Sequence, residues 1–249
     1  MTPASPDCAG FCRDCGREHV LPAGPAEPHA RELMAELERC GSIGLGRDGD
    51  PRLGLEYLHG PARGQMFGVL ACRDSAGREH VLKAFSGQYN GIWLVPGWVP
   101  PILDPQEFMR VTGRDEPRIK ELTRRIAALP ADAPLRRTLL AGRRELSRDL
   151  MARIFDLYRL TNFRGLSRSL AEVFPGRMPT GTGECCAPKL LHHAARQGLA
   201  PLGLAEFYLG RENKAATRAH GHFYAPCEEK CRPILGFLLC GARELRQSI

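Results

Sequence analysis

The sequence lacks long hydrophobic runs. Its longest apolar stretches, Gly91–Leu103 and Ile234–Cys240, are interrupted or far shorter than the roughly 20 apolar residues that a helix needs to cross a bilayer. We therefore expect no membrane-spanning segment. The first residues, Met1–Cys8, have neither a basic start nor an apolar run, so we expect no secretion signal and take a reducing cytoplasmic compartment as the default.

Internal repeats and low-complexity tracts are also absent, and the 27 glycines and 20 prolines follow no period. With 43% hydrophobic and 25% charged residues, the composition is that of an ordinary globular protein. This excludes a fibrous or an intrinsically disordered chain. A length of 249 residues suffices for one sizeable core, or for one core with a small additional module.

Positive charge is concentrated in one part of the chain. Residues 114–164 contain thirteen Lys and Arg against seven Asp and Glu, which accounts for most of the net charge of +7. This surplus fits a polyanionic partner, for which we favour RNA, with Arg136, Arg137, Arg143 and Arg144 as the candidate contacts. The alternative is a pair of solvated helices with no nucleic-acid partner.

Ten cysteines in a reducing compartment are more often metal ligands or buried side chains than disulfide partners. The first group lies in residues 1–25, which have too few large apolar residues to fold by burial alone. It offers Cys8, Cys12, Cys15 and His19, enough for one tetrahedral zinc ion, with Cys40 or His29 as substitutes for Cys8. Residues 1–40 are therefore predicted to form a small structural zinc knuckle followed by a short helix.

Hydrophobic periodicity and turn signals predict the remaining elements. Strands are expected at 66–72 and 80–85, joined by a turn, and again at 199–209. Helices are expected at 28–40, 115–129, 135–160, from near Pro188 to Gly198, and at 226–240. The helices at 115–129 and 135–160 are joined by a short link, which predicts an antiparallel pair.

A second group of cysteines is expected to meet at the ends of helices. Cys227 and Cys231 are four residues apart near a helix start, so both sulfurs lie on one face, where the positive helix end favours thiolates. A third ligand would come from Cys185 or Cys186. The other of these two, or His220 or His222, would close the site, whereas a water in the fourth position would make it catalytic. Cys40, Cys72 and Cys240 stand alone and are interpreted as small buried side chains.

This order of elements resembles the zinc-dependent cytidine deaminase fold. In that family a His or Cys with a nearby Glu opens one helix and Pro-Cys-x-x-Cys opens the next; Cys186, Pro226, Cys227 and Cys231 occupy the matching places, although the second pair here is Cys-x3-Cys. The resemblance implies a three-layer α/β core over residues 51–249 with a helical insertion at about 107–164. It implies one zinc ion, substrate contacts from Ser86, Gln88 and Asn90 and from His220 and His222, and Glu184 as proton shuttle, since Pro188 stands where the usual Glu would be.

A second resemblance covers most of the chain after about residue 55. The segments Gly64–Leu70, Ala84–Gly87, Gly183–Leu191, Ala205–Phe207 and His220–Tyr224 are similar to the N-terminal extension of bacterial pseudouridine synthases that modify tRNA and ribosomal RNA. The synthase domain itself is missing, because no His-Arg-Leu-Asp stretch is present. The resemblance implies a module linked to RNA modification without isomerase chemistry.

Two hypotheses follow. In the first, the chain is a nucleobase deaminase in which Tyr89, Trp93 and Trp98 stack a flipped base and the basic helices hold the nucleic acid. In the second, a zinc ion with four protein ligands stabilises an RNA-binding module that performs no chemistry. A weaker third hypothesis, thiol redox chemistry at Cys185 and Cys186, is disfavoured because no Cys-x-x-Cys motif precedes that helix.

Overall fold

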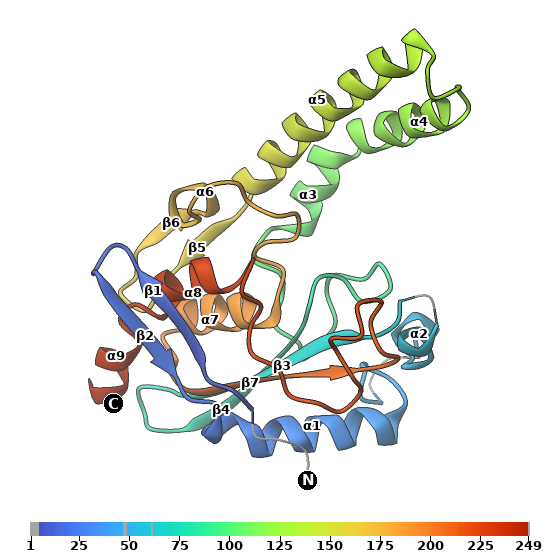
Figure 1. Ribbon diagram of the computed structural model, residues 1–249. Helices are drawn as coiled ribbons and strands as arrows, with labels where there is room; N and C mark the ends of the chain where they lie inside the picture. Colours follow the sequence, from blue (N-terminus) through green and yellow to red (C-terminus); the bar gives the residue numbers. More distant parts are fainter. Residues whose placement is uncertain (1–4, 47–48, 61, 249) are drawn as a thin grey trace.

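The computed structural model describes residues 5–46, 49–60 and 62–248, and it is a mixed α/β protein. At its centre is a three-stranded antiparallel sheet in the order β4-β3-β7 (Figure 1). The middle strand β3 (Gln65–Arg73) pairs with β4 (Glu79–Phe85) on one side and with β7 (Ala200–Leu209) on the other. Within the described ranges, no helix has the length and apolar character needed to cross a membrane.

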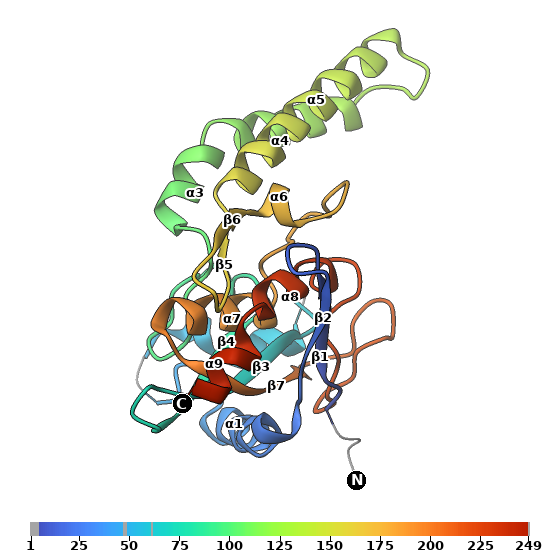
Figure 2. The same cartoon turned by 90° about the vertical axis from the view of Figure 1, so that its left-hand side faces the viewer.

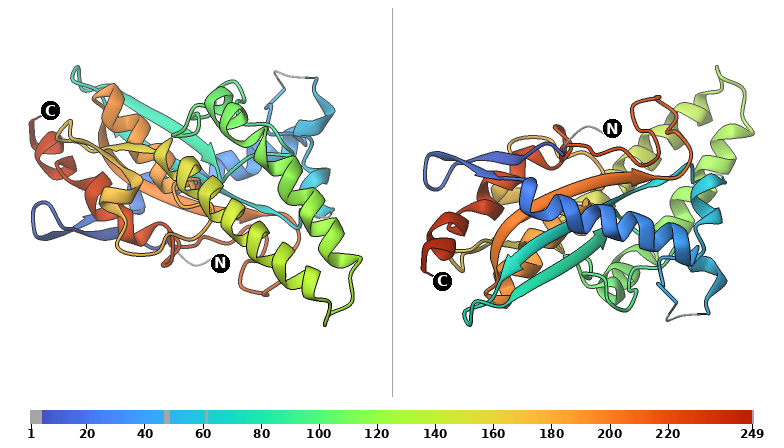
Figure 3. Two further views of the ribbon diagram at one scale, coloured as in Figure 1. Left: turned by 90° about the horizontal axis from the view of Figure 1, so that it is seen from above. Right: turned by 90° about the horizontal axis from the view of Figure 1, so that it is seen from below.

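Two helices cover opposite faces of this sheet, because side chains alternate along β3. Phe67 and Val69 face α1 (Glu27–Cys40) and share one core cluster with its leucines. Leu70 faces the other way and packs in a second cluster with α7 (Cys186–Gln197). Figure 3 shows α1 lying across the sheet in the view from below. The sheet therefore lies between α1 and the N-terminal end of α7.

The N-terminal hairpin packs on the last long helix of the core. Strands β1 (Cys8–Cys12) and β2 (Arg17–Leu21) form a two-stranded sheet that lies against α8 (Arg232–Leu239), and α8 also packs on α7. Because α1 covers the central sheet, residues 8–40 are part of the core. We predicted a separate knuckle over residues 1–40, and the described part of that range does not stand apart.

Three helices form an arm that projects from the core (Figure 2). They are α3 (Pro105–Thr112), α4 (Asp115–Ala127) and α5 (Pro134–Asp156), and α4 packs along α5 as the short link predicts. The chain returns through β5 (Arg159–Thr161), β6 (Ser167–Ser169) and α6 (Leu170–Val173). Short elements complete the described chain: η1 (Gly24–Ala26), η2 (Pro51–Leu53), α2 (Glu56–His59) and α9 (Ala242–Ser248).

The predicted order of core elements, a strand hairpin, a helix, a strand and a helix, is confirmed by β3, β4, α7, β7 and α8. Two helix starts differ from the prediction. Helix α7 begins at Cys186, before Pro188, and α8 begins at Arg232, after the predicted start at Pro226. Between Cys227 and Cys231 the chain forms a turn, in which the Cys231 amide donates to the Cys227 carbonyl at 3.1 Å.

His192 on α7 makes the stability of the fold depend on pH. Its Nδ1 atom accepts a hydrogen bond from the Thr161 amide of β5 at 3.1 Å, and burial lowers the pKa of His192 to about 4. Because the unfolded pKa is about 6.5, protonation favours the unfolded chain, so this contribution is complete above pH 6.5 and is lost as pH falls towards 4.

We therefore expect His192→Gln to remove a pH-dependent contribution of about 2 kcal/mol between pH 7 and pH 4.5. Urea unfolding of both proteins at the two pH values measures it: the stability difference between wild type and variant should shrink at the lower pH. A difference that is equal at both pH values would contradict the assignment.

Candidate metal centres

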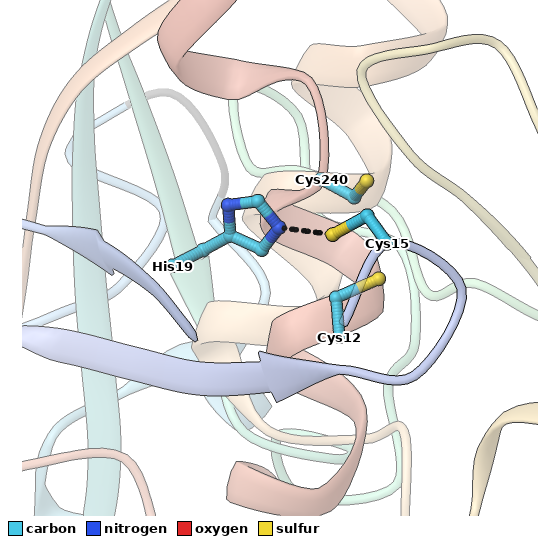
Figure 4. A group of neighbouring side chains, drawn as sticks. All are labelled: Cys12, Cys15, His19 and Cys240. Atoms are coloured by element: carbon cyan, nitrogen blue, oxygen red, sulfur yellow. Dashed lines mark hydrogen bonds between the residues drawn. The ribbon is translucent and has the colours of Figure 1, made fainter. Parts of the chain in front are cut away.

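The first centre joins the two ends of the described chain (Figure 4). One ligand atom from each of Cys12, Cys15, His19 and Cys240 lies within 4.8 Å of all the others. Cys15 Sγ lies 3.1 Å from His19 Nε2. Three sulfurs and one imidazole are a donor set typical of closed, structural zinc sites. These residues could therefore hold one metal ion with four protein ligands.

Close packing of two backbones brings Cys240 to this centre. Cys12, Cys15 and His19 belong to the β1–β2 hairpin, whereas Cys240 directly follows α8. A Cβ atom on Gly236 of α8 would lie only 2.1 Å from the Phe11 backbone. Because both Gly10 and Gly236 lack side chains, β1 lies directly on α8 and the sulfur of Cys240 meets the hairpin turn.

Cys8 was predicted as a ligand of this centre, and that prediction is wrong. Cys8 and Cys12 stand at opposite ends of β1, about 13 Å apart at the rise of an extended strand. The side chain of Cys8 is fully buried in the apolar core, where burial raises the pKa of its thiol. The suggested substitutes Cys40 and His29 lie on α1, outside this group of ligands.

The second centre lies where two helices begin. The sulfurs of Cys185, Cys227 and Cys231 all lie within 4.8 Å of one another, with Cys227 3.9 Å from Cys185 and 3.3 Å from Cys231. Cys185 is the N-cap of α7 and Cys231 is the N-cap of α8. Hydrogen bonds with Cys185 and Cys231 lower the pKa of Cys227, which favours the thiolate that a metal ion requires.

The third ligand was predicted to be Cys185 or Cys186, and the deaminase resemblance implied Cys186. The structure places Cys185 beside Cys227 and Cys231. Successive residues at a helix start point about 100° apart, so only one of the two adjacent sulfurs can face Cys227. The sulfur of Cys186 instead donates to the Met66 carbonyl at 3.3 Å, and its side chain packs against Gly68 of β3. Cys186 therefore anchors the start of α7 to the sheet.

Neither of the two histidines predicted to close this centre does so. The ring of His220 accepts from the Gly210 amide at 3.1 Å through Nδ1 and lies 3.0 Å from Glu38 through Nε2. His222 is exposed. Among the described residues, no fourth His, Cys, Asp or Glu joins Cys185, Cys227 and Cys231. The described residues therefore offer three candidate ligands at this centre, one fewer than at the first.

A cavity of about 50 Å³ is lined by two of these three residues, Cys185 and Cys227. This volume holds one or two water molecules, which occupy about 30 Å³ each in the liquid. Of the predicted substrate contacts, Ser86 lines the cavity, whereas Gln88 is exposed and the Asn90 amide donates to the Arg52 carbonyl. The complete lining is Met66, Ser86, Cys185, Cys186, Glu206, Arg218, Ala225 and Cys227.

Glu206 is the one carboxyl group on the wall of this cavity, and sequence reasoning missed it. It lies in the middle of β7, and its Oε1 atom accepts a hydrogen bond from the Ala187 amide of α7 at 2.7 Å. Burial raises the pKa of Glu206 to about 7. A single charged residue within the apolar stretch Ala200–Leu209 was the available signal, because a buried carboxyl group needs a partner or a function.

Glu184, the predicted proton shuttle, lies just before the metal ligand Cys185. Its Oε1 atom accepts a hydrogen bond from the Tyr158 hydroxyl, and its other carboxylate oxygen is buried without a hydrogen-bond partner among the described residues. Burial raises its pKa to about 7, as for Glu206. Glu184 does not belong to the lining of the cavity, so it is Glu206, and not Glu184, that lines the cavity together with Cys185 and Cys227.

The three aromatic residues predicted to stack a base have structural contacts. Tyr89 is fully buried and donates to the Gly54 carbonyl at 2.9 Å, and Trp98 is buried and donates to the Ile43 carbonyl at 2.8 Å. Trp93 packs edge-on against Phe108 at the base of the arm. None of the three lines the cavity, and Tyr89 and Trp98 are part of the core, as aromatic residues beside prolines more often are.

The two centres differ in the number of ligands the protein supplies, four at one and three at the other. Four ligands complete a tetrahedral site, whereas three leave a position for water or substrate. The chain was compared with protein-family models, with curated proteins and with solved structures, and none of them matches it.

Proposed function

We propose that the chain is a zinc-dependent nucleobase deaminase, with its reaction centre at Cys185, Cys227 and Cys231. The observation that carries this proposal is a set of three thiols, without a fourth protein ligand in the described chain, beside a cavity that holds a buried carboxyl group. Three protein ligands and one open position are the arrangement found in hydrolytic zinc sites. A purely structural site would gain from a fourth ligand, as at the first centre.

The reaction would replace the amino group of a cytosine-type or adenine-type base by a carbonyl oxygen from water, with release of ammonia. A zinc ion at this position would supply a Lewis acid that makes water a strong nucleophile at neutral pH. The carboxyl group of Glu206 would take a proton from that water and deliver it to the leaving amine. Its hydrogen bond to the Ala187 amide fixes the carboxyl group in the orientation this transfer needs.

Glu206 suits this role better than Glu184 because it borders the space where water would lie. Glu184 is held by the Tyr158 hydroxyl at the turn before Cys185. We assign proton transfer to Glu206 and assign to Glu184 the positioning of the turn that presents Cys185. The candidate ligands Cys185 and Cys231 stand at the starts of α7 and α8, and the chain also has an antiparallel strand pair, β3 and β4. This arrangement supports the likeness to the deaminase family.

Access for a base requires movement of the chain around the cavity. The cavity of about 50 Å³ accepts water, and the segment that contributes Arg218 and Ala225 to its wall is the connection between β7 and α8. Enzymes of this class extrude the target base from its strand into the active site. In this proposal the connection moves outward when a base enters.

A second function, a zinc-stabilised RNA-binding module without chemistry, is favoured by one observation. The small size of the cavity suits a structural centre in which water completes the coordination, while the basic arm offers a much larger exposed surface. On this alternative, nucleic acid binds and no base is changed.

Comparison of Glu206→Gln with Glu184→Gln tests the proposal. We expect Glu206→Gln to retain zinc and to lower ammonia release from cytosine-containing and adenine-containing oligonucleotides at least about 100-fold, since general acid–base catalysis contributes about 10²–10⁴. Glu184→Gln should lower it less than about tenfold, because its carboxyl group acts only through the turn before Cys185.

Three results would count against this assignment. Equal activity of the Glu206 variant and the wild type would remove Glu206 from the reaction. A larger loss in Glu184→Gln than in Glu206→Gln would return proton transfer to Glu184. A wild-type protein that binds nucleic acid but releases no ammonia from either base would support the binding module.

A further inference from the structure

A groove of about 810 Å³ lies on the arm. It lies between α5 and the segment 177–180, which leads towards Cys185. This groove is separate from the cavity of the second metal centre, with which it shares no lining residue. Its lining is Ala141, Arg143, Arg144, Ser147, Arg148, Met151, Ala152, Phe155, Arg177, Met178 and Thr180.

The charged side chains that line the groove are all cationic. Four arginines line it and no acidic residue does. Within the described ranges none of the four forms an ion pair, and the recorded side-chain contact among them is a 3.5 Å hydrogen bond from Arg143 to Thr123. Four other arginines of the arm are paired with carboxylates: Arg110 with Glu107, Arg118 and Arg153 with Asp115, and Arg124 with Glu121.

The floor of the groove is apolar. Met151, Ala152 and Phe155 of α5 face Met178 across it. A single nucleic-acid strand has phosphates along one edge and flat, largely apolar bases along the other. The unpaired guanidinium groups of the groove suit the phosphates, and its apolar, partly aromatic floor suits the bases. Bases packed on the floor would leave the phosphates within reach of Arg144, Arg148 and Arg177.

We propose that this groove binds single-stranded nucleic acid. The inference rests on the proposed function in one respect: the groove would hold the strand whose base the second candidate centre would convert. The segment that ends the groove at Thr180 continues in the sequence to Glu184 and Cys185, so a short stretch of chain joins the groove to the second candidate centre. RNA and DNA share the chemistry recognised, and the experiment separates them.

The test compares two triple variants of the full-length chain that lose the same charge. Arg144→Gln/Arg148→Gln/Arg177→Gln removes three unpaired arginines of the groove, and Arg110→Gln/Arg118→Gln/Arg124→Gln removes three arginines paired with carboxylates. Binding of fluorescent twelve-residue oligo(U) and oligo(dT) is titrated from 50 to 300 mM salt, and circular dichroism checks that both variants are folded.

We expect the groove variant to lose at least about tenfold in affinity at 100 mM salt, and the slope of log affinity against log salt to become shallower by about 2, since each lost phosphate contact on a single strand contributes about 0.7. The control should lose less than about threefold. Tighter binding of oligo(U) would identify RNA as the preferred strand, and tighter binding of oligo(dT) would identify DNA.

Equal losses in the two variants would show a general charge effect and overturn the proposal. So would a wild-type protein that binds neither oligomer, or an oligo-glutamate of the same length that competes as well as the nucleic acid, which would indicate an acidic protein partner. The test measures binding and not ammonia release, so the groove can be confirmed even if the deaminase proposal fails.

Discussion

Replacing Cys240 with serine is expected to abolish zinc binding at the first candidate centre and to destabilise the whole chain. Cys240 is the ligand that links the N-terminal hairpin to the end of α8. A structural zinc ion contributes about 10–16 kcal/mol of apparent binding free energy in small domains, and a three-ligand remnant retains only part of it. We expect the free energy of unfolding of the zinc-loaded protein to fall by at least about 3 kcal/mol.

Cys8→Ala is the matched control for this variant. Cys8 lies in the same stretch of sequence as the hairpin ligands and is as deeply buried as Cys240, but it contacts the apolar core. It should therefore lose some stability and keep both zinc ions. Elemental analysis and thermal unfolding with and without a chelator measure the two effects. Loss of zinc in Cys8→Ala, or two zinc ions retained in Cys240→Ser, would contradict the assignment of ligands.

Gly236→Ala is expected to have the second largest effect. The added methyl group would lie 2.1 Å from the backbone carbon and oxygen of Phe11 and 2.5 Å from the Cys12 amide. Backbone atoms cannot rotate away as a side chain can, so β1 must move off α8. Overpacking of a core costs about 1–3 kcal/mol, and we expect the upper end of that range together with weaker zinc binding at Cys240.

Gly142→Ala is the control, because the same substitution is expected to raise stability there. Gly142 lies in the exposed interior of α5, where no atom lies within 4 Å of an added Cβ. Alanine is favoured over glycine inside a helix by about 0.5–1 kcal/mol, so this variant should be slightly more stable and keep both metal ions. If Gly236→Ala were as stable as the wild type, the close contact between β1 and α8 would be incorrect.

The elements that local patterns define were predictable from the sequence. The turn between β3 and β4 contains Asp74 and Gly77, and the amphipathic spacing of Leu33 and Leu37 marks α1 before it ends at Gly41. These features depend on neighbours in the chain, so their signals are local. The short β5–β6 hairpin has no comparable pattern, because its strands contain only three residues each.

The sequence predicted those candidate ligands that lie close together along the chain. It did not predict which distant residues join them, because that depends on how the helices and strands pack. Cys227 and Cys231 share one turn of chain, and their proximity follows from spacing alone. The choice between Cys185 and Cys186 depends on the rotation of α7 against β3, which a sequence does not reveal. Cys240 joins the first centre only because two glycines allow a strand and a helix to touch. Glu206 is beside the second centre only because β7 pairs with β3.

A crystal structure of the zinc-loaded protein, with anomalous data collected on both sides of the zinc absorption edge, tests the central claim most directly. The account predicts a zinc ion bonded at about 2.3 Å to the sulfurs of Cys185, Cys227 and Cys231, with a water at about 2.0 Å as the fourth ligand and the Glu206 carboxyl group beside that water. A fourth protein side chain on this zinc ion, or three thiols without any metal, would contradict it.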